Sequence, residues 1–341
     1  MDKELSTLIE RLQGHTKSCE DKCLDLKVLK FEAKEGEMRL YLDGTDRTYY
    51  FKSDPKNPRD PKIIHAAKQF CKIISVPYSF FAKNTESMKN QLVGCWLPSL
   101  KSEKSAVLGK LRKSSTDANS SIIRALLPVE FTNIPNAEIL TIIGEAIQDD
   151  FKVEFVIGDE RDDLLLHVRF ISNDSFEVCG EKCSTGFSVI ASELGAVPIS
   201  VETILFRDSS KAAMIASYSG ESFFETDYEG IQPAAVKELF PKLVGLLRGQ
   251  LNDLQMKIQS AKGLTENKED ISGLLRSLRL HKGLNEKFHV LLYQEIENNE
   301  VNNRWDFVNR MAILAKDFDV ATRVKIEKVA GELIGLTFEK I

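Results

Sequence analysis

The stretch LLLHVRFISNDSFEVCGEKCSTGFSVI (164–190) decides the fold of this chain. Short apolar runs alternate with polar residues and are interrupted by turn-forming pairs such as Asn173–Asp174 and Cys179–Gly180. Strands of four to eight residues separated by such turns are typical of antiparallel sheets. The stretch, with its continuation SVETILF (200–206), therefore predicts strands over 164–171, 175–179, 184–190 and 200–206.

The segments on either side extend this pattern into an α+β chain. After Gly230 the apolar spacing changes to three and four residues, which predicts helices over 233–261, 267–279, 284–297 and 303–334. Before Gly230 the same criteria predict helices over 3–13, 61–74, 80–96 and 136–148, and further strands over 24–32, 37–42, 48–53, 105–113, 121–127, 151–157 and 211–218. We expect antiparallel, β-rich N-terminal and middle regions followed by a C-terminal helical region.

One stripe of the last helical segment predicts a buried tryptophan. Trp305, Val308, Ala312 and Ala315 follow one another at spacings of three or four residues. Such residues share one face of a helix, so we expect the Trp305 indole to pack in the core. The alternative is an exposed indole that stacks on a base or anchors a partner.

Charge divides the chain into three regions. Residues 1–113 hold 22 Lys+Arg against 15 Asp+Glu, a net charge of +7. Residues 114–231 hold 7 against 21, a net charge of −14, and residues 232–341 hold 17 against 15, a net charge of +2. We predict three regions with these bounds: a basic α+β region, an acidic β-rich region and a helical region. A basic region can bind a polyanion, or it can contact the acidic region of another copy.

The basic region also contains residues suited to nucleic acid. Flexible cations contact phosphates, and aromatic rings stack on bases. The candidate phosphate contacts are Lys56, Arg59, Lys62, Lys68, Lys101, Lys104, Lys110, Arg112 and Lys113, and the candidate stacking residues are Tyr49, Tyr50, Phe51, Tyr78, Phe80 and Phe81. The alternative is a solvated surface over aromatic residues of the core.

Two groups of residues suggest metal chemistry, and we expect neither to be a metal site. His15, Cys19 and Cys23 would share one face of a helix, but a structural zinc needs four ligands. Cys179 and Cys183 bracket a short turn. Asp159, Glu160, Asp162 and Asp163 are neighbours on a predicted turn, where adjacent side chains point apart. We expect reduced thiols, a solvated acidic turn, and no cofactor.

Familiar catalytic motifs do not occur in the sequence. It contains no Gly-x-Ser-x-Gly, no Walker A loop and no Gly-x-Gly-x-x-Gly. His65 and His167 have no nucleophile in a recognised local motif. These absences favour a binding protein over an enzyme. The longest apolar runs are also too short to cross a bilayer, and the charged start does not resemble a secretory signal.

The order of several segments resembles the phage- and plasmid-borne domain-of-unknown-function family 932. The segments are 74–97, 122–140, 186–207 and 304–334. An Arg-Ala-x-Leu pattern is matched by Arg124, Ala125 and Leu127, Phe131 replaces a Tyr of the family, and Asn136 fits. Ala191–Gly195 resembles the Asn-Ser-Glu-x-Gly signature with Ala in place of Asn, and Trp305, Asn309, Ala330 and Gly331 resemble a late helical motif. The resemblance implies a mobile-element origin and no reaction.

Together these observations predict a non-enzymatic protein that binds nucleic acid and assists replication or recombination on single strands. We expect it in the cytoplasm of a bacterial host or associated with a phage, as a homo-oligomer joined through its basic and acidic regions. One alternative is a self-assembling structural or interaction protein of a phage, whose head-to-tail contacts form rings or filaments. The other is a metal-dependent enzyme.

Overall fold

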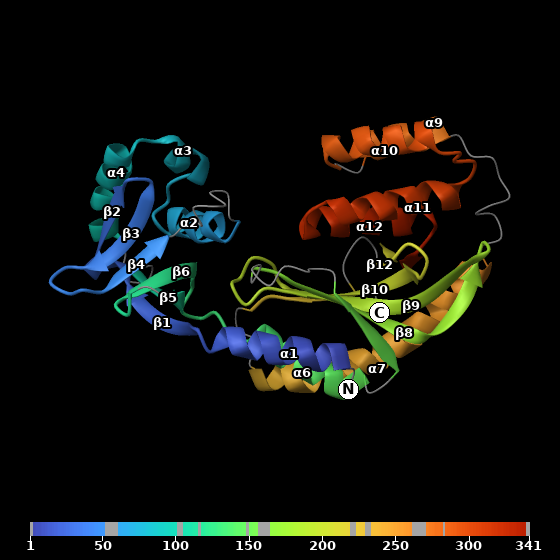
Figure 1. Cartoon of the computed structure of the whole chain (residues 1–341), viewed down its shortest axis with the longest axis horizontal. Helices are drawn as coiled ribbons and strands as arrows, with labels where there is room; N and C mark the ends of the chain where they lie inside the picture. The colour runs from blue at the N-terminus through green and yellow to red at the C-terminus, as the bar shows by residue number, and fades with distance from the viewer. Residues whose placement is uncertain are drawn as a thin grey trace.

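The computed structural model describes residues 3–51, 61–100, 105–114, 117–147, 150–155, 164–218, 223–228, 233–260, 271–281 and 284–338. Two mixed lobes lie side by side, each built on its own sheet (Figure 1). Antiparallel sheets dominate the first half and middle, and helices dominate the end, so the predicted α+β class is confirmed. None of the helices in these ranges combines the length and apolar character that crossing a bilayer requires.

The first lobe is a six-stranded sheet with helices on one face. Its strands lie in the order β1 (Cys19–Asp25), β5 (Ala106–Lys113), β6 (Ser120–Leu127), β4 (Thr48–Phe51), β3 (Glu37–Leu42) and β2 (Leu29–Lys34). Neighbours are antiparallel except β4 and β6, which are parallel. The helices α2 (Pro61–Ile73), α3 (Tyr78–Lys83) and α4 (Glu86–Ser99) cover one face, where Leu40, Phe51, Phe70 and Leu111 form the core.

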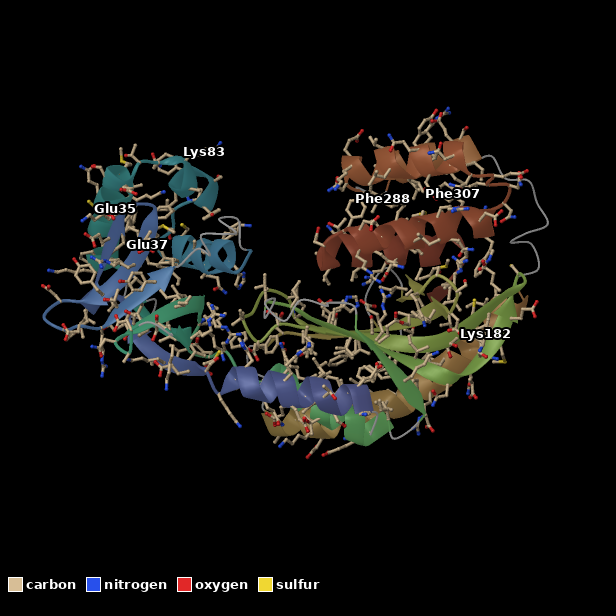
Figure 2. The ribbon with its side chains drawn as sticks, in the orientation of Figure 1. Glu35, Glu37, Lys83, Lys182, Phe288 and Phe307 are labelled. Carbon is tan, nitrogen blue, oxygen red and sulfur yellow. The ribbon has the colours of Figure 1, made fainter. Side chains whose placement is uncertain are left out.

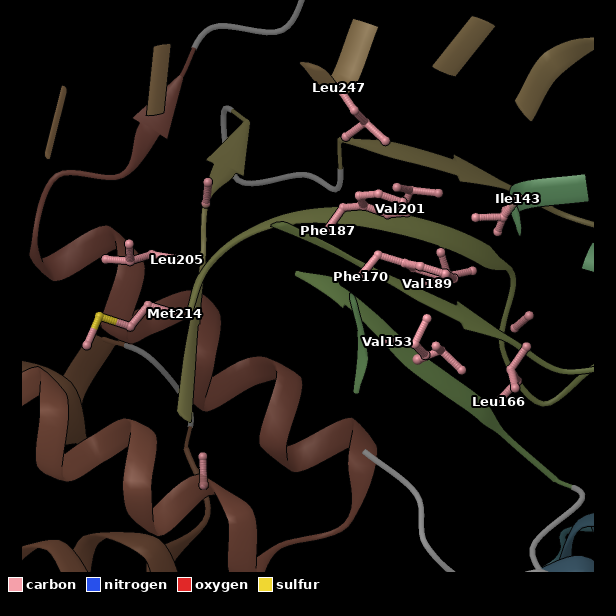
Figure 3. Packing of buried hydrophobic residues seen from close by; sticks show 14 of the residues in the cluster. Ile143, Val153, Leu166, Phe170, Phe187, Val189, Val201, Leu205, Met214 and Leu247 are labelled. Carbon is pink, nitrogen blue, oxygen red and sulfur yellow. The ribbon is translucent and has the colours of Figure 1, made fainter. Parts of the chain in front are cut away.

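The second lobe has three layers. Its central sheet has the order β11 (Ala212–Ile215), β10 (Ile199–Arg207), β9 (Glu181–Ala191), β8 (Leu166–Val178) and β7 (Phe151–Phe155), and β13 (Phe224–Thr226) also pairs with β10. One face packs on α6 (Asn136–Ile147) and α7 (Pro233–Ser260), and Phe170, Phe187, Val189 and Val201 fill that interface (Figure 3).

The opposite face of the second sheet lies under the C-terminal helices. These are α11 (Arg304–Leu314) and α12 (Val320–Leu333), with α10 (Glu286–Asn298) and α9 (Ile271–His281) stacked farther out (Figure 1). Figure 2 places Phe288 of α10 and Phe307 of α11 in the space between those two helices, where both are fully buried. A short two-stranded sheet joins β12 (Ser217–Tyr218) to β14 (Thr337–Phe338).

Several predicted segments differ from the observed elements. The helix predicted at 80–96 is two helices, α3 and α4, and the strand predicted at 211–218 is two strands, β11 and β12. Residues 24–32 form parts of β1 and β2, separated by a 3₁₀ turn at Leu26–Val28 that Asp25 caps. The strands predicted at 164–171 and 175–179 are a single strand, β8, with an irregularity between Ile171 and Ser175. The single helix predicted at 303–334 is two helices, because Asp319 accepts a hydrogen bond from the Thr322 backbone N and starts α12 there.

The predicted boundary at residue 113 divides a hairpin. β5 ends at Lys113, and its antiparallel partner β6 lies in the same sheet. At the other end, α1 (Lys3–Thr16) leaves the first lobe and packs beside α6, with Leu5, Leu8 and Ile9 buried in the core of the second lobe. Residues 1–113 therefore do not form one separate structural unit.

Two glycines of the segment 186–207 lie where a side chain would meet neighbouring atoms. A Cβ on Gly186 would lie 2.3 Å from the Phe170 carbonyl oxygen on β8. Gly195 has φ +67, and a Cβ there would lie 2.7 Å from a methyl carbon of Leu127. Both positions require glycine for local backbone and packing reasons, so they indicate structure rather than chemistry.

Candidate nucleic-acid interface

The face of the first sheet that lies opposite its helices carries a continuous row of side chains. Successive residues of a strand point to opposite faces, so the register of the strands fixes the row. It runs Cys19 (β1), Arg112 (β5), Ile122 (β6), Tyr50 (β4), Arg39 (β3) and Glu32 (β2), with each residue paired to the next across the sheet. All six are half-buried. We call this row the cross-sheet row.

Aromatic and cationic groups alternate in the middle of this face. The Arg39 guanidinium lies 5.8 Å from the ring centroid of Tyr41, which points to the same face two residues later. Hydrogen bonds with Tyr50 and Glu32 raise the pKa of Arg39, and the Nε–Oε2 distance to Glu32 is 2.7 Å. Lys30 stands at the edge of the face and pairs with Asp43. Flat rings beside fixed cations suit stacked bases and phosphates.

The nine predicted phosphate contacts do not share this face. Arg112 belongs to the cross-sheet row, and Lys113 is exposed at the end of β5. Lys62 and Lys68 are on α2, on the helix-covered side of the sheet, and Lys68 is exposed with its Nζ 5.9 Å from the Tyr78 ring centroid. The side chain of Lys62 and the residues Lys56, Arg59, Lys101 and Lys104 lie outside what the structure describes.

Lys110 is buried, with 3% of its surface exposed. Its Nζ lies 2.8 Å from Oδ2 of Asp21 on the neighbouring strand, and 5.9 Å from the Phe131 ring centroid. Burial lowers the pKa of Lys110, and Asp21 opposes that shift. In this structure Lys110 ties β5 to β1, and it does not present an exposed cation for phosphate.

The predicted stacking residues also divide between core and surface. Tyr49, Phe51 and Phe81 are buried in the core of the first lobe. Tyr50 is half-buried in the cross-sheet row, and Phe80 is 52% exposed on α3. Arg39 and Tyr41 were not among the residues predicted to contact nucleic acid. The signal for them was the alternation of Arg39, Leu40, Tyr41 and Leu42, which separates a core face from an open face.

His15, Cys19 and Cys23 do not share a helix, so that part of the metal-site geometry was wrong. His15 belongs to α1, whereas Cys19 and Cys23 belong to β1. The helix ends at Thr16 and the strand begins three residues later. Among the residues that the structure describes, no three His, Cys, Asp or Glu side chains gather to hold a metal ion. The acidic cluster at 158–163 lies outside those residues.

A buried charged layer separates the second sheet from α12. Arg169 of β8 donates from Nη2 to both carboxylate oxygens of Glu327, at 2.5 and 2.6 Å, and Arg323 donates to the same carboxylate at 2.9 Å. Glu202 of β10 pairs with Lys328 at 2.7 Å. In the sequence alone, Arg169 had no predicted role, and His167 was only a histidine without a nucleophile in a recognised local motif. The structure shows both to be 1% exposed.

Two side chains of α2 connect the lobes. Nε2 of His65 lies 2.9 Å from the Leu194 carbonyl oxygen of the second lobe, and Gln69 donates to the same oxygen at 3.3 Å. Gln69 also accepts a hydrogen bond from the Leu126 backbone N at 2.9 Å. A cavity beside these contacts is lined by Lys72, Glu130, Phe131 and Asp227, among others. His65 thus has a structural contact that accounts for its position.

Comparisons with protein-family models, with curated proteins and with solved structures found no match to this chain. The resemblance to domain-of-unknown-function family 932 therefore stays a prediction.

Proposed function

We propose that the chain binds single-stranded nucleic acid on the open face of its first sheet, in the service of replication or recombination of a phage or plasmid. The observation that carries the proposal is the cross-sheet row, in which Tyr50 lies between Arg39 and Arg112 with only Ile122 interposed. Bases stack on tyrosine rings without regard to sequence, and arginines hold the backbone phosphates. Resemblance to a mobile-element family supports the biological setting.

The open face favours a single strand over a duplex. Tyr41 and Tyr50 are half-buried on the sheet, so an approaching ring can lie against them, but they do not project as a wedge. In a duplex the bases are stacked on one another and their faces are not available. A single strand can turn its bases toward the sheet while its phosphates reach Arg39, Arg112 and the exposed Lys34.

Replacing Tyr50 with alanine is expected to weaken binding roughly 5- to 100-fold, because loss of one stacked base costs about 1–3 kcal/mol. The measurement is fluorescence anisotropy with a labelled thymidine 20-mer, a duplex of matched length and the corresponding RNA. Tyr293→Ala is the matched control, since Tyr293 is 53% exposed on α10 in the other lobe. Equal losses in both variants would contradict stacking on the sheet.

Replacing Arg112 with glutamine is expected to lower the salt dependence of binding by about 0.7 in the slope of log K against log salt, because one phosphate contact is lost. Lys68→Gln serves as the matched control on the helix-covered side of the sheet and should leave the slope unchanged. A lower slope for Lys68→Gln together with an unchanged slope for Arg112→Gln would place the interface on α2 instead of the open sheet face. Light scattering in the same series measures the mass and tests the predicted homo-oligomer.

A further inference from the structure

A thiol, an imidazole and a guanidinium from separate segments meet where α1 leads into β1. The Sγ of Cys19 lies 3.8 Å from Nε2 of His15 and accepts a hydrogen bond from Nη1 of Arg124 on β6 at 3.2 Å. The hydroxyl of Ser18 lies 3.9 Å from the same sulfur. The hydroxyl of Ser18 donates to the His15 carbonyl oxygen at 2.7 Å, whereas His15 and Arg124 can each donate a hydrogen bond to the sulfur, and Arg124 adds a permanent positive charge. Such surroundings stabilise a thiolate.

The fold holds the Arg124 guanidinium in place. Its side chain is 5% exposed, and its Nη2 lies 2.8 Å from Oε1 of Glu193 in the second lobe. The other oxygen of Glu193 accepts a hydrogen bond from the backbone N of Asn136, at the start of α6, at 3.3 Å. An arginine does not lose its proton in proteins. The sulfur of Cys19 therefore faces a cation whose charge and position are both fixed.

Cys19 differs from the buried cysteines of the same chain. Burial raises the pKa of Cys19, but the hydrogen bond with His15 and the charge of Arg124 lower it by more, so the net pKa falls below its ordinary value. At Cys71 burial dominates and raises the pKa to about 12. Cys19 is also half-exposed, whereas Cys71 is buried, so a small reagent in solution can reach only the first of these two sulfurs.

We propose that Cys19 is a modification site, a thiolate that small hydroperoxides oxidise to sulfenic acid. The sulfur attacks one oxygen of the peroxide and the O–O bond breaks. That oxygen joins Sγ with its hydrogen to give the sulfenic acid. The other oxygen leaves as hydroxide from hydrogen peroxide, or as alkoxide from an alkyl hydroperoxide, and takes up a proton to become water or the alcohol. The sulfur loses two electrons and the peroxide gains them, so the hydroperoxide is the oxidant and no further reactant is needed.

Cys19 lies where its modification would affect both the cross-sheet row and the contact between the two lobes. Cys19 is the end member of the cross-sheet row and pairs directly with Arg112. It also lies at the contact that ties β6 to Glu193 of the second lobe. An added oxygen at Sγ would disturb the Arg124 contact at the junction of the lobes. The proposal does not rest on nucleic-acid binding, and its experiment uses the protein alone.

The first test measures the rate at which iodoacetamide alkylates each cysteine of the native full chain from pH 5.5 to 9.5, by mass spectrometry. The midpoint for Cys19 should lie below that for Cys23, which is exposed on the same strand. His15→Gln should raise the Cys19 midpoint without changing the melting temperature. Cys23→Ser should leave it unchanged. A Cys19 midpoint equal to or above that of Cys23 overturns the proposal, as does an unaltered midpoint in His15→Gln.

The second test treats the protein with hydrogen peroxide at a small molar excess and traps sulfenic acid with dimedone. We expect the label on Cys19 ahead of the exposed Cys23 and Cys95 by at least about tenfold, and a loss of most of that preference in His15→Gln. Label spread evenly over the exposed cysteines would mean that accessibility alone governs oxidation, and the proposal would then fail.

Discussion

Replacing Trp305 with alanine is expected to lower the free energy of unfolding by about 3–5 kcal/mol, which is typical for loss of a buried tryptophan. The indole is 2% exposed and belongs to the same core as Val308, Ala312 and Ala315, so the predicted stripe is confirmed. Its Nε1 also donates to Oε2 of Glu181 at 3.2 Å. Removal of the ring therefore leaves a cavity and takes one donor from a carboxylate that Arg207 also binds.

The other tryptophan of the chain provides a matched control. Trp96 is 45% exposed on α4, so Trp96→Ala should change the free energy of unfolding by no more than about 0.5 kcal/mol. Urea denaturation followed by circular dichroism at 222 nm measures both variants without relying on the indole signal. If Trp305→Ala unfolds at the wild-type midpoint and loses affinity for nucleic acid, the indole has a binding role and its buried position is incorrect.

Local periodicity was enough to predict the α+β class but not which elements pack together. Leu5, Leu8 and Ile9 repeat at helical spacing and are buried, and Met38, Leu40 and Leu42 alternate and face the core of the first lobe. Such a pattern predicts which face of a helix or strand is buried, because that face follows from the spacing of apolar residues within the element. It does not predict which other element packs against that face. The packing of α1 on α6, across more than 100 residues of sequence, had no local signal.

The candidate interface was only partly predictable for the same reason. Tyr50 and Arg112 were candidates on composition, but their common face depends on the parallel pairing of β4 with β6, which joins segments about 70 residues apart. Lys110 and Arg112 are two residues apart and point to one face, yet Asp21 and Phe131 cover the first and leave the second accessible. Composition located the basic region, and only tertiary contacts separate its buried cations from its exposed ones.

The buried layer under α12 shows where a local pattern misleads. Alternating polar residues in a strand usually indicate a solvated face. Arg169 of β8 and Glu202 of β10 are both 1% exposed. Each forms an ion pair with a residue of α12, Arg169 with Glu327 and Glu202 with Lys328. The sequence contains both halves of each pair, but nothing in either half identifies the other.

Replacing Glu327 with glutamine is expected to destabilise the protein by about 3–5 kcal/mol, because it leaves two buried guanidinium groups without their carboxylate. Glu327 is fully buried and accepts from Arg169 and Arg323. The matched control is Glu300→Gln, since Glu300 is exposed. The measurement is the same urea denaturation.

A triple variant separates the role of charge from the role of packing. Arg169→Met, Arg323→Leu and Glu327→Met together remove all three charges and keep similar side-chain volumes. Burying ions costs solvation energy that their attraction only partly returns, so apolar side chains of this size are often as stabilising or more so. We expect the triple variant to recover most of the stability that Glu327→Gln loses. If it is less stable than the single variant, the ion pairs contribute more to the packing of α12 on β8 than apolar contact can replace.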